Sequence, residues 1–375
     1  MSITVRSFAK INLGLRIGAA REDGFHDLLT VYQTIGLHDV IRVSVGRGSG
    51  IEIQCADPRV PRDDSNTCFR IVERAMRALS AKGRVVIDID KRLPVQGGMG
   101  GASSNAVATL LGLERALKKS LPVVEKLRIA AEVGSDLPLF LVGGTVLGVG
   151  RGEQVYPVED LPAMACVVVT PEVGVSTPKA FAAWDRLCGV SICGAGTPAR
   201  EAAPLPSSSE MVHGQKPAEL RSTGQPVAAV PTRASNLTGG QEKLTVSGGS
   251  DRMNELGRGL SAWLSENASS APSDLLARRG RAENPLLWLV RAGIENDFER
   301  VVFPEYPELS EGKRALLRAG AKYASLSGSG STLYGLFASR EAAAQAAGRL
   351  RKSGWTAQAT VTVPRRAYWK RLIAG

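Results

Sequence analysis

The segment PVQGGMGGASSN, residues 94–105, constrains the fold of this chain more than any other segment. Four of the five positions 97–101 are glycine. An alternating apolar run precedes the segment at residues 85–90, and a second apolar run follows it at residues 106–113. This order predicts a strand, a glycine loop and a helix. Because glycine lets the backbone approach an anion and the first N–H groups of a helix face negative charge, the segment predicts a phosphate-binding loop.

The spacing separates this loop from two common phosphate motifs. No Gly-Lys-Ser/Thr follows the glycines, as a Walker loop requires. Neither the GxGxxG spacing nor the later ribose-binding acid of a dinucleotide site is present. One alternative stays open at this point, in which the glycines form a flexible turn and Ser103 or Ser104 caps the helix.

Length and composition are those of a globular protein with one large or two medium domains: 375 residues, of which 43% are hydrophobic and 22% charged. No run of about eighteen apolar residues occurs, and the N-terminal residues alternate like a strand, without the apolar block of a signal peptide. We therefore expect no membrane span and a cytoplasmic location. The five cysteines form an odd, sparse set and are expected to be reduced thiols without a zinc site.

The formal net charge of +11 raises the question of nucleic-acid binding. The basic residues are dispersed, with many in the C-terminal third, whereas binding to a nucleic-acid backbone needs them on one face. An anionic small-molecule substrate also benefits from a positive field. We therefore expect no nucleic-acid partner.

The chain is uneven along its length. Residues 1–185 are dense in alternating strands and apolar helices, whereas residues 189–250 consist largely of Gly, Ser, Pro, Ala and Thr. No aromatic residue occurs between Trp184 and Trp263. Such a segment buries too little apolar surface to offset its ordering entropy, so we expect a disordered insertion. The elements expected after it are helices at 253–264 and 285–290, a strand pair around 327–332 and a basic surface helix at 365–375.

Four further segments accompany the glycine loop: SFAKINL at 7–13, REDGFH at 21–26, GSDLPLF at 134–140 and LSGSGST at 326–332. Together with the loop they resemble the GHMP kinases, the family of galactokinase, homoserine kinase and mevalonate kinase. The resemblance covers roughly residues 3–185 and 252–350. The AKIN and DGFH segments are its specific part. They resemble those GHMP kinases of isoprenoid-precursor biosynthesis whose acceptor alcohol carries a cytidine diphosphate group.

The resemblance implies an α+β fold, the GHMP kinase two-domain fold. An N-terminal domain of the ribosomal-protein-S5 type would span residues 1–160 and carry the phosphate loop. A C-terminal α/β domain would span residues 161–363, interrupted by the insertion at about 189–250, and residues 364–375 would form a basic tail. The active site would lie in the cleft between the two domains.

The resemblance also implies an ATP-dependent kinase with Asp136 as the catalytic base and Lys10 as its companion. A carboxylate can accept the proton of the acceptor hydroxyl, and a lysine beside it can stabilise the alkoxide. The residues themselves leave alternatives open. Asp136 lies between a helix at 126–132 and an apolar, strand-like run at 137–142, and it can also be the cap of a helix. Lys10 can also lie at a strand edge and extend its ammonium group into water.

Binding residues follow from the resemblance as well. Those expected to bind ATP are Pro94, Gly97, Gly98, Met99, Gly100, Gly101, Ala102, Ser103 and Ser104. Those expected to bind the acceptor are Asn12, Phe25, His26, Tyr32, Phe181, Gly328, Ser329 and Gly330. Phe25, where the family usually has tyrosine, offers a flat face to cytosine, and His26 offers a ring nitrogen to its edge. A structural histidine and a plain glycine hairpin are the alternatives for His26 and for residues 327–332. No dedicated metal side chains are expected, since Mg²⁺ would arrive with ATP and could touch Ser103 or Ser104.

Two rival functions stay open on the same fold. Another GHMP kinase would act on a small alcohol such as mevalonate or homoserine, but such kinases generally lack the DGFH segment. A sensor without catalysis would be expected to have lost Lys10 or Asp136, and both are present. We expect a small-molecule substrate with a cytidine diphosphate group, neither a membrane nor a nucleic-acid partner, and a monomer or a homodimer.

Overall fold

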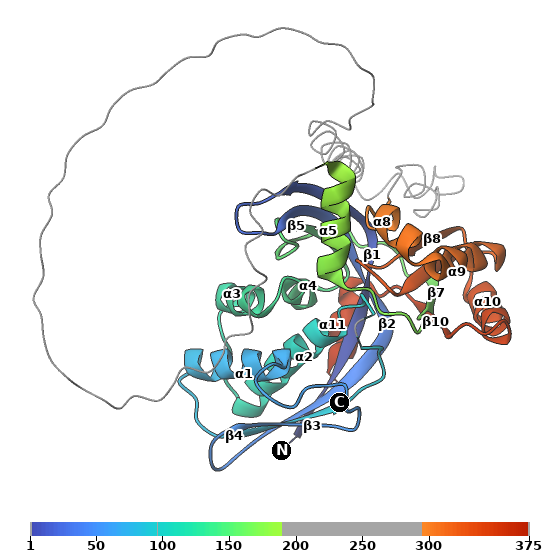
Figure 1. Ribbon diagram of the computed structural model, residues 1–375. Helices are drawn as coiled ribbons and strands as arrows, with labels where there is room; N and C mark the ends of the chain where they lie inside the picture. Colours follow the sequence, from blue (N-terminus) through green and yellow to red (C-terminus); the bar gives the residue numbers. More distant parts are fainter. Residues whose placement is uncertain (1, 96, 190–294, 374–375) are drawn as a thin grey trace, which may run out of the picture.

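The computed structural model of this chain describes residues 2–95, 97–189 and 295–373. Within these ranges the chain forms two sheets with helices packed on them (Figure 1). The mixed helix and strand content is that of the predicted α+β class. Residues 190–250 of the predicted insertion, and the helices predicted at 253–264 and 285–290, lie outside the described residues.

The first sheet has six strands and comes from the N-terminal half of the chain. Its strands are β1 (Ser2–Ala20), β2 (His26–Gly46), β3 (Ile51–Cys55), β4 (Arg84–Asp90), β5 (Thr145–Val149) and β6 (Gln154–Pro157). The order is β3-β4-β2-β5-β6, and β1 pairs with β2. All pairings are antiparallel except that of β3 with β4. The alternating run at 85–90 therefore is a strand, as predicted.

Helices cover one face of the first sheet (Figure 1). They are α1 (Thr67–Ala78), α2 (Gly101–Leu117), α3 (Val123–Val133), α4 (Leu137–Val142) and α11 (Arg365–Leu372). Helix α2 packs against β1 and β2 on one side and against α1 and α4 on the other. This position explains why α2 is apolar around most of its circumference, since every residue from Ser104 to Glu114 is buried.

Helix α11 occupies the position of the predicted basic surface helix, and one side of it is part of the core. Tyr368 and Leu372, four residues apart, are 1% and 2% exposed. The Tyr368 hydroxyl donates to the carbonyl of Phe140 (2.7 Å), and its ring lies so close to Gly143 that a Cβ there would be 2.3 Å from a ring carbon. The basic residues of the helix conceal this apolar side in the sequence, because the helix has only two turns in which a period could show.

The second sheet has four antiparallel strands in the order β10-β7-β9-β8. They are β7 (Ala165–Val169), β8 (Tyr323–Leu326), β9 (Leu333–Phe337) and β10 (Ala357–Val361). The helices around it are α5 (Thr177–Cys188), α8 (Glu299–Glu305), α9 (Pro307–Arg318) and α10 (Arg340–Lys352). The predicted strand pair is present as β8 and β9, and residues 327–332 form the connection between them.

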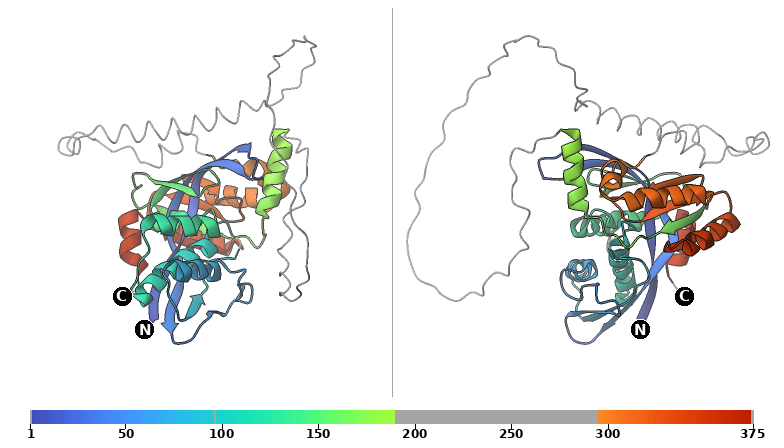
Figure 2. Two further views of the ribbon diagram at one scale, coloured as in Figure 1. Left: turned by 90° about the vertical axis from the view of Figure 1, so that its left-hand side faces the viewer. Right: turned by 45° about the vertical axis from the view of Figure 1, so that its right-hand side comes forward.

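Strands β1 and β2 are long, at 19 and 21 residues, and run along both halves of the molecule (Figures 1 and 2). Ala9, Ile11 and Leu13 of β1 share a core cluster with Val168 of β7 and Tyr334 of β9. The middle of β1 is therefore the place where the two sheets meet. The side chains of Ala9, Ile11 and Leu13 therefore lie between the two halves of the molecule.

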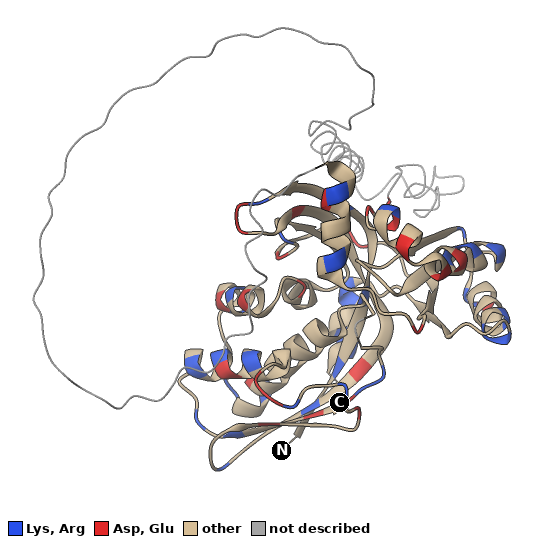
Figure 3. Cartoon of the chain, viewed as in Figure 1, with Lys and Arg blue, Asp and Glu red and all other residues tan. Residues whose placement is uncertain are grey.

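Charge is distributed without a single-sign face in the view of Figure 3, where basic and acidic side chains are interspersed on the helices and loops. None of the helices in the described ranges is both long enough and apolar enough to cross a bilayer.

Candidate active site

The glycine loop connects β4 to α2, as the sequence predicts. Gly98 and Gly100 have φ angles of 74° and 66°, a region that favours glycine. A Cβ on Gly98 would lie 2.3 Å from the carbonyl oxygen of Ser327, so this position has no room for a side chain. Helix α2 begins at Gly101 with Gly100 at the cap position and no side-chain cap. The alternative of a serine-capped turn is therefore wrong.

The two serines of the loop lie in the first turn of α2 and have different surroundings. Ser104 is 2% exposed, and its hydroxyl lies 2.7 Å from that of Ser7. Ser103 is only partly buried. The Ser104 hydroxyl therefore contacts a buried residue of strand β1, whereas the Ser103 hydroxyl lies nearer the surface.

Lys10 lies where two irregularities in the pairing of β1 with β2 flank residues 10–12. Lys10 is 3% exposed, its Nζ donates to Asn12 Oδ1 (2.7 Å), and its backbone N–H donates to the Met99 carbonyl of the glycine loop (3.0 Å). Nζ also lies 3.4 Å from Asp136 Oδ2. A buried ammonium with these partners excludes a lysine that extends into water.

Asp136 directly precedes α4, yet its carboxylate makes no cap hydrogen bond to that helix. Instead it pairs with Lys10 and accepts a hydrogen bond from the Tyr32 hydroxyl (3.2 Å). Its side chain is 34% exposed, so the carboxylate remains reachable from solvent. The cap alternative therefore fails. The prediction of a strand-like run at 137–142 is also wrong: these residues form α4, because an apolar run of six residues carries no period that separates a strand from a buried helix.

Tyr32 lies beneath this pair and not beside an open base-binding face. Its ring is 2% exposed, with Lys10 Nζ 5.5 Å from its centroid. Burial, and secondly the Asp136 carboxylate, raise the pKa of Tyr32 well above its usual value. The hydroxyl therefore stays protonated and acts as a donor to Asp136.

Phe25 and His26 are neighbours in sequence but have different environments. The Phe25 ring is 50% exposed, and the Arg151 guanidinium lies 4.9 Å from its centroid. His26 is 7% exposed, with Nε2 2.6 Å from Asp185 Oδ1. Its ring stacks on Phe181 at 4.8 Å and 11°. The structure thus brings His26 and Phe181 together, and one of the two imidazole nitrogens already has a protein partner.

The second glycine loop, residues 327–332, lies against the first. The Ser327 hydroxyl donates to the Gly98 carbonyl (3.0 Å), and the Thr332 N–H donates to the Gly97 carbonyl (3.2 Å). A Cβ on Gly328 would lie 3.5 Å from Lys10 Nζ. Gly328 of this loop therefore lies next to the ammonium group of Lys10.

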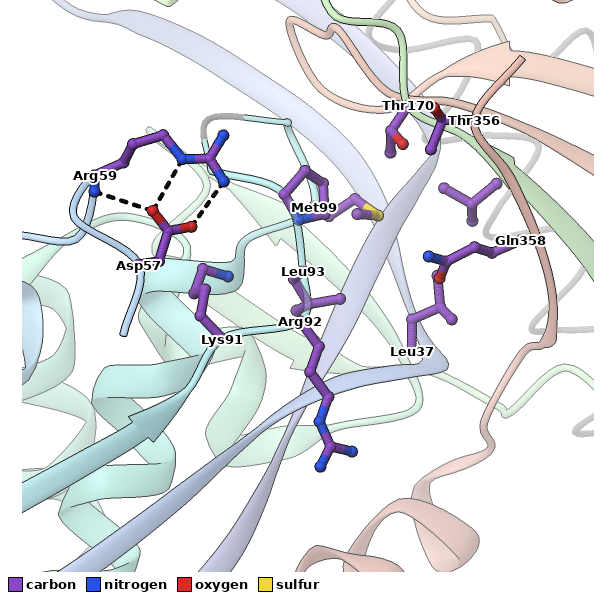
Figure 4. Close-up of a pocket in the computed structure, with 12 residues that line it drawn as sticks. Leu37, Asp57, Arg59, Lys91, Arg92, Leu93, Met99, Thr170, Thr356 and Gln358 are labelled. Carbon is purple, nitrogen blue, oxygen red and sulfur yellow. Dashed lines mark hydrogen bonds and ion pairs between the residues drawn. The ribbon is translucent and has the colours of Figure 1, made fainter. Parts of the chain in front are cut away.

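A pocket of about 240 Å³ opens beside the first glycine loop (Figure 4). Its lining includes Pro94 and Met99 of the loop, Val168 of the second sheet with Thr170 and Thr356 beside it, and four charged residues: Asp57, Arg59, Lys91 and Arg92. The Arg59 guanidinium hydrogen-bonds to Asp57 and lowers the pKa of that carboxyl to about 2.

The sequence analysis did not predict the charged residues of this pocket, nor the buried Asp39 that holds the segment before the glycine loop. Asp39, which is fully buried, accepts hydrogen bonds from Lys91 Nζ and from the N–H groups of Arg92 and Leu93, each at 2.7 Å. These three residues lead directly into Pro94 and the glycine loop. The Lys-Arg pair before the loop was the available signal, whereas nothing in the sequence connects it with Asp39.

A glycine loop at a helix N-terminus, a buried lysine paired with a reachable aspartate, and a second glycine loop next to the lysine define a small-molecule kinase of the GHMP class. Two family models agree with this class. The one described as "GHMP kinases N terminal domain" matches residues 66–144, and the one described as "GHMP kinases C terminal" matches residues 282–354.

Curated relatives specify the family further. A 4-diphosphocytidyl-2-C-methyl-D-erythritol kinase from Solibacter usitatus is 31% identical over 371 residues, which cover 99% of this chain and 92% of the relative. The enzyme of the same name from Geobacter sulfurreducens is 29% identical over 366 residues, which cover 96% and 99%. The chain therefore belongs to the 4-diphosphocytidyl-2-C-methyl-D-erythritol kinases within the GHMP kinase family.

Solved structures agree in fold. A crystal structure of 4-(cytidine 5'-diphospho)-2C-methyl-D-erythritol kinase has a TM-score of 0.61 at 24% identity, covering 96% of this chain and 99% of that one. A homoserine kinase from Cytophaga hutchinsonii has a TM-score of 0.63 at 18% identity, with 98% and 96% covered. Since the two scores are nearly equal, the fold by itself does not separate these substrates.

Proposed function

We propose that this chain transfers the γ-phosphoryl group of ATP to the 2-hydroxyl of 4-(cytidine 5'-diphospho)-2-C-methyl-D-erythritol, in the non-mevalonate isoprenoid precursor pathway. The observation that carries this proposal is the Lys10–Asp136 pair between the two glycine loops, in a chain with full-length relatives of that name.

In this mechanism Asp136 accepts the proton of the acceptor hydroxyl. Its carboxylate is reachable from solvent, whereas Lys10 behind it is buried and fixed by Asn12. The buried ammonium group of Lys10 stabilises the alkoxide as it forms. The Tyr32 hydroxyl holds the carboxylate in one orientation.

ATP would bind along the first glycine loop. The backbone of residues 97–104 faces the phosphates at the start of α2, and the adjoining pocket, with Arg59 and Lys91, accepts the nucleoside part. Mg²⁺ prefers oxygen ligands and keeps several waters, so the hydroxyl of Ser103 or Ser104 is a donor of the right kind. When bound, Mg²⁺ neutralises charge on the phosphates.

The cytidine group would bind around Phe25, whose half-exposed ring offers a stacking face. His26 and Phe181 form the adjoining wall, held by Asp185. Asn12 would contact the acceptor beside Lys10, and Gly328, Ser329 and Gly330 would close over its phosphate side.

Two rival functions are weaker. A homoserine or mevalonate kinase would share this fold, but the DGFH segment supports a cytidyl acceptor. A sensor without catalysis is disfavoured by the intact Lys10–Asp136 ion pair. The division at about residues 160 and 364, the cytoplasmic location, the lack of a nucleic-acid partner and the choice between monomer and homodimer stay predictions.

The test is an ADP-release assay with a panel of alcohols: the cytidyl substrate, free methylerythritol, mevalonate and homoserine. We expect efficient turnover only with the cytidyl substrate. Comparable kcat/KM for free methylerythritol or mevalonate would refute the proposed acceptor, and no ADP release with any alcohol would favour the sensor.

A further inference from the structure

Residues 295–299 (ENDFE), which lead into the first residue of α8, link β1 to the second glycine loop. The Leu15 N–H donates to the Glu295 carbonyl (3.0 Å), and the Asp297 N–H donates back to the Leu15 carbonyl (2.9 Å). The segment is thereby fixed to the strand that carries Lys10 and Asn12.

Asn296, in the middle of this segment, uses its whole side chain to hold the loop. It is 2% exposed, and its Nδ2 donates to the carbonyls of Leu326 (2.9 Å) and Gly328 (2.7 Å). Its Oδ1 accepts from the Phe298 N–H (3.1 Å). Because two acceptors face the nitrogen and a donor faces the oxygen, the orientation of the amide is fixed by its partners.

These bonds set the direction of the loop's peptide groups. In a planar trans peptide the C=O and the N–H point in opposite directions. Since the Gly328 carbonyl points to Asn296, the Ser329 N–H points away from it. The Ser327 carbonyl accepts from the Gly330 N–H (3.1 Å). The Gly328 N–H belongs to the same peptide group as that carbonyl, so it points away from Gly330.

The N–H groups of Gly328 and Ser329 have no hydrogen-bond partner among the described residues. Both residues are buried, and buried N–H groups without a partner are rare in folded proteins. The Cβ position of Gly328 is 3.5 Å from Lys10 Nζ, so these donors lie beside the catalytic pair. A ligand with anionic oxygens would satisfy them.

We propose that Asn296 is a positioning residue that fixes the direction in which the peptide groups of the second glycine loop face. By holding the carbonyls of Leu326 and Gly328, it keeps them away from the site and leaves the N–H groups of Gly328 and Ser329 to bind phosphate oxygens. Without Asn296 these peptides can turn, and a carbonyl facing a phosphate repels it. The inference rests on the proposed phosphoryl transfer, because that reaction brings the phosphate oxygens to the loop.

The test compares Asn296→Ala and Asn296→Asp with wild type. Asn296→Asp keeps the size of the side chain and the acceptor for Phe298, but places an oxygen against both carbonyls. The matched control is Glu299→Gln, in the same segment, because Glu299 accepts from the Leu326 N–H (2.9 Å) and holds strand β8 without touching the loop carbonyls. Melting temperatures of all three variants report the loss of stability separately.

We expect both Asn296 variants to lower kcat/KM for the acceptor at least about tenfold, with the KM for ATP within about twofold and Glu299→Gln close to wild type. A fall in kcat assigns the N–H groups to the transferred phosphoryl group, and a rise in KM assigns them to the diphosphate of the acceptor. If Asn296→Ala melts below the assay temperature, Asn296→Asp decides. Unchanged kcat/KM, or an equal loss in Glu299→Gln, would overturn the inference. The proposed function fails separately, when wild type turns over a different alcohol in the panel.

Discussion

Lys10 is a buried cation, and the chemistry of the site depends on how its charge is balanced. Removing an ammonium group from water is costly unless it is paired and hydrogen-bonded. Asn12 supplies the hydrogen bond and Asp136 the opposite charge. Because both partners contact the same buried ammonium group, the three side chains act as a unit, and replacing one of them changes the surroundings of the others.

Phe25 gives the prediction for substrate recognition at this scale. Phe25→Ala removes the stacking face, and since base–aromatic stacking contributes roughly 1–3 kcal/mol, the KM for the cytidyl substrate should rise about ten- to a hundredfold. The KM for ATP should change little. Phe25→Tyr keeps the flat face and is the control, with a KM near that of wild type. Equal KM values for Phe25→Ala and wild type would mean that the base binds elsewhere.

At the scale of elements, patterned segments were predictable. The strand, glycine loop and helix around residues 94–105 are confirmed, because alternation, glycine spacing and a long apolar run each carry a strong local signal. Helix α4 was predicted as strand-like because it is too short to show a period. The hydrogen bond between His26 and Asp185 joins residues 159 positions apart, and no local pattern encodes such a pair.

The contact between the two glycine loops gives the prediction at this scale. Gly98→Ala places a Cβ 2.3 Å from the Ser327 carbonyl, at a positive φ, so one loop must move. We expect a loss of roughly 1–3 kcal/mol in unfolding free energy and a fall in kcat of at least about tenfold. Urea unfolding and steady-state kinetics measure the two effects. Gly174→Ala, with no atom within 4 Å of its Cβ, is the control and should match wild type. If kcat of Gly98→Ala equalled that of wild type, the prediction would be wrong, because catalysis would not depend on the contact between the two loops.

At the scale of the whole molecule, β1 and β2 join the two halves (Figure 2). Val5 and Phe8 pack in the core of the first sheet, and Leu15 and Ile17 pack in the core of the second. Lys10 and Asn12 lie between these two sets on one strand. The site is therefore located where the cores meet, and each core helps to hold it.

Buried tyrosines in both halves predict how stability depends on pH. Burial raises the pKa of Tyr32, Tyr334 and Tyr368 in the folded chain above the ordinary value of 10.0. Below that value their contribution to stability is complete, and it is lost as the pH rises beyond it, because the unfolded chain ionises first. The urea midpoint should therefore fall as the pH rises above about 10, and less steeply in Tyr334→Phe than in the exposed control Tyr156→Phe. If the urea midpoints of the two variants fell with pH at the same slope, this account would be contradicted.

The central claim is that Asp136 and Lys10 form one catalytic unit, and the kcat of Asp136→Asn tests it most directly. The substitution keeps the size of the side chain and removes the proton acceptor. We predict that kcat falls at least about a hundredfold with a modest change in KM for ATP, while the surface control Asp88→Asn stays at wild type. Lys10→Ala should be similarly damaging, and the double variant should lose less than the product of the two. A kcat of Asp136→Asn close to that of wild type would contradict the account, because orientation of the hydroxyl would then suffice for phosphoryl transfer.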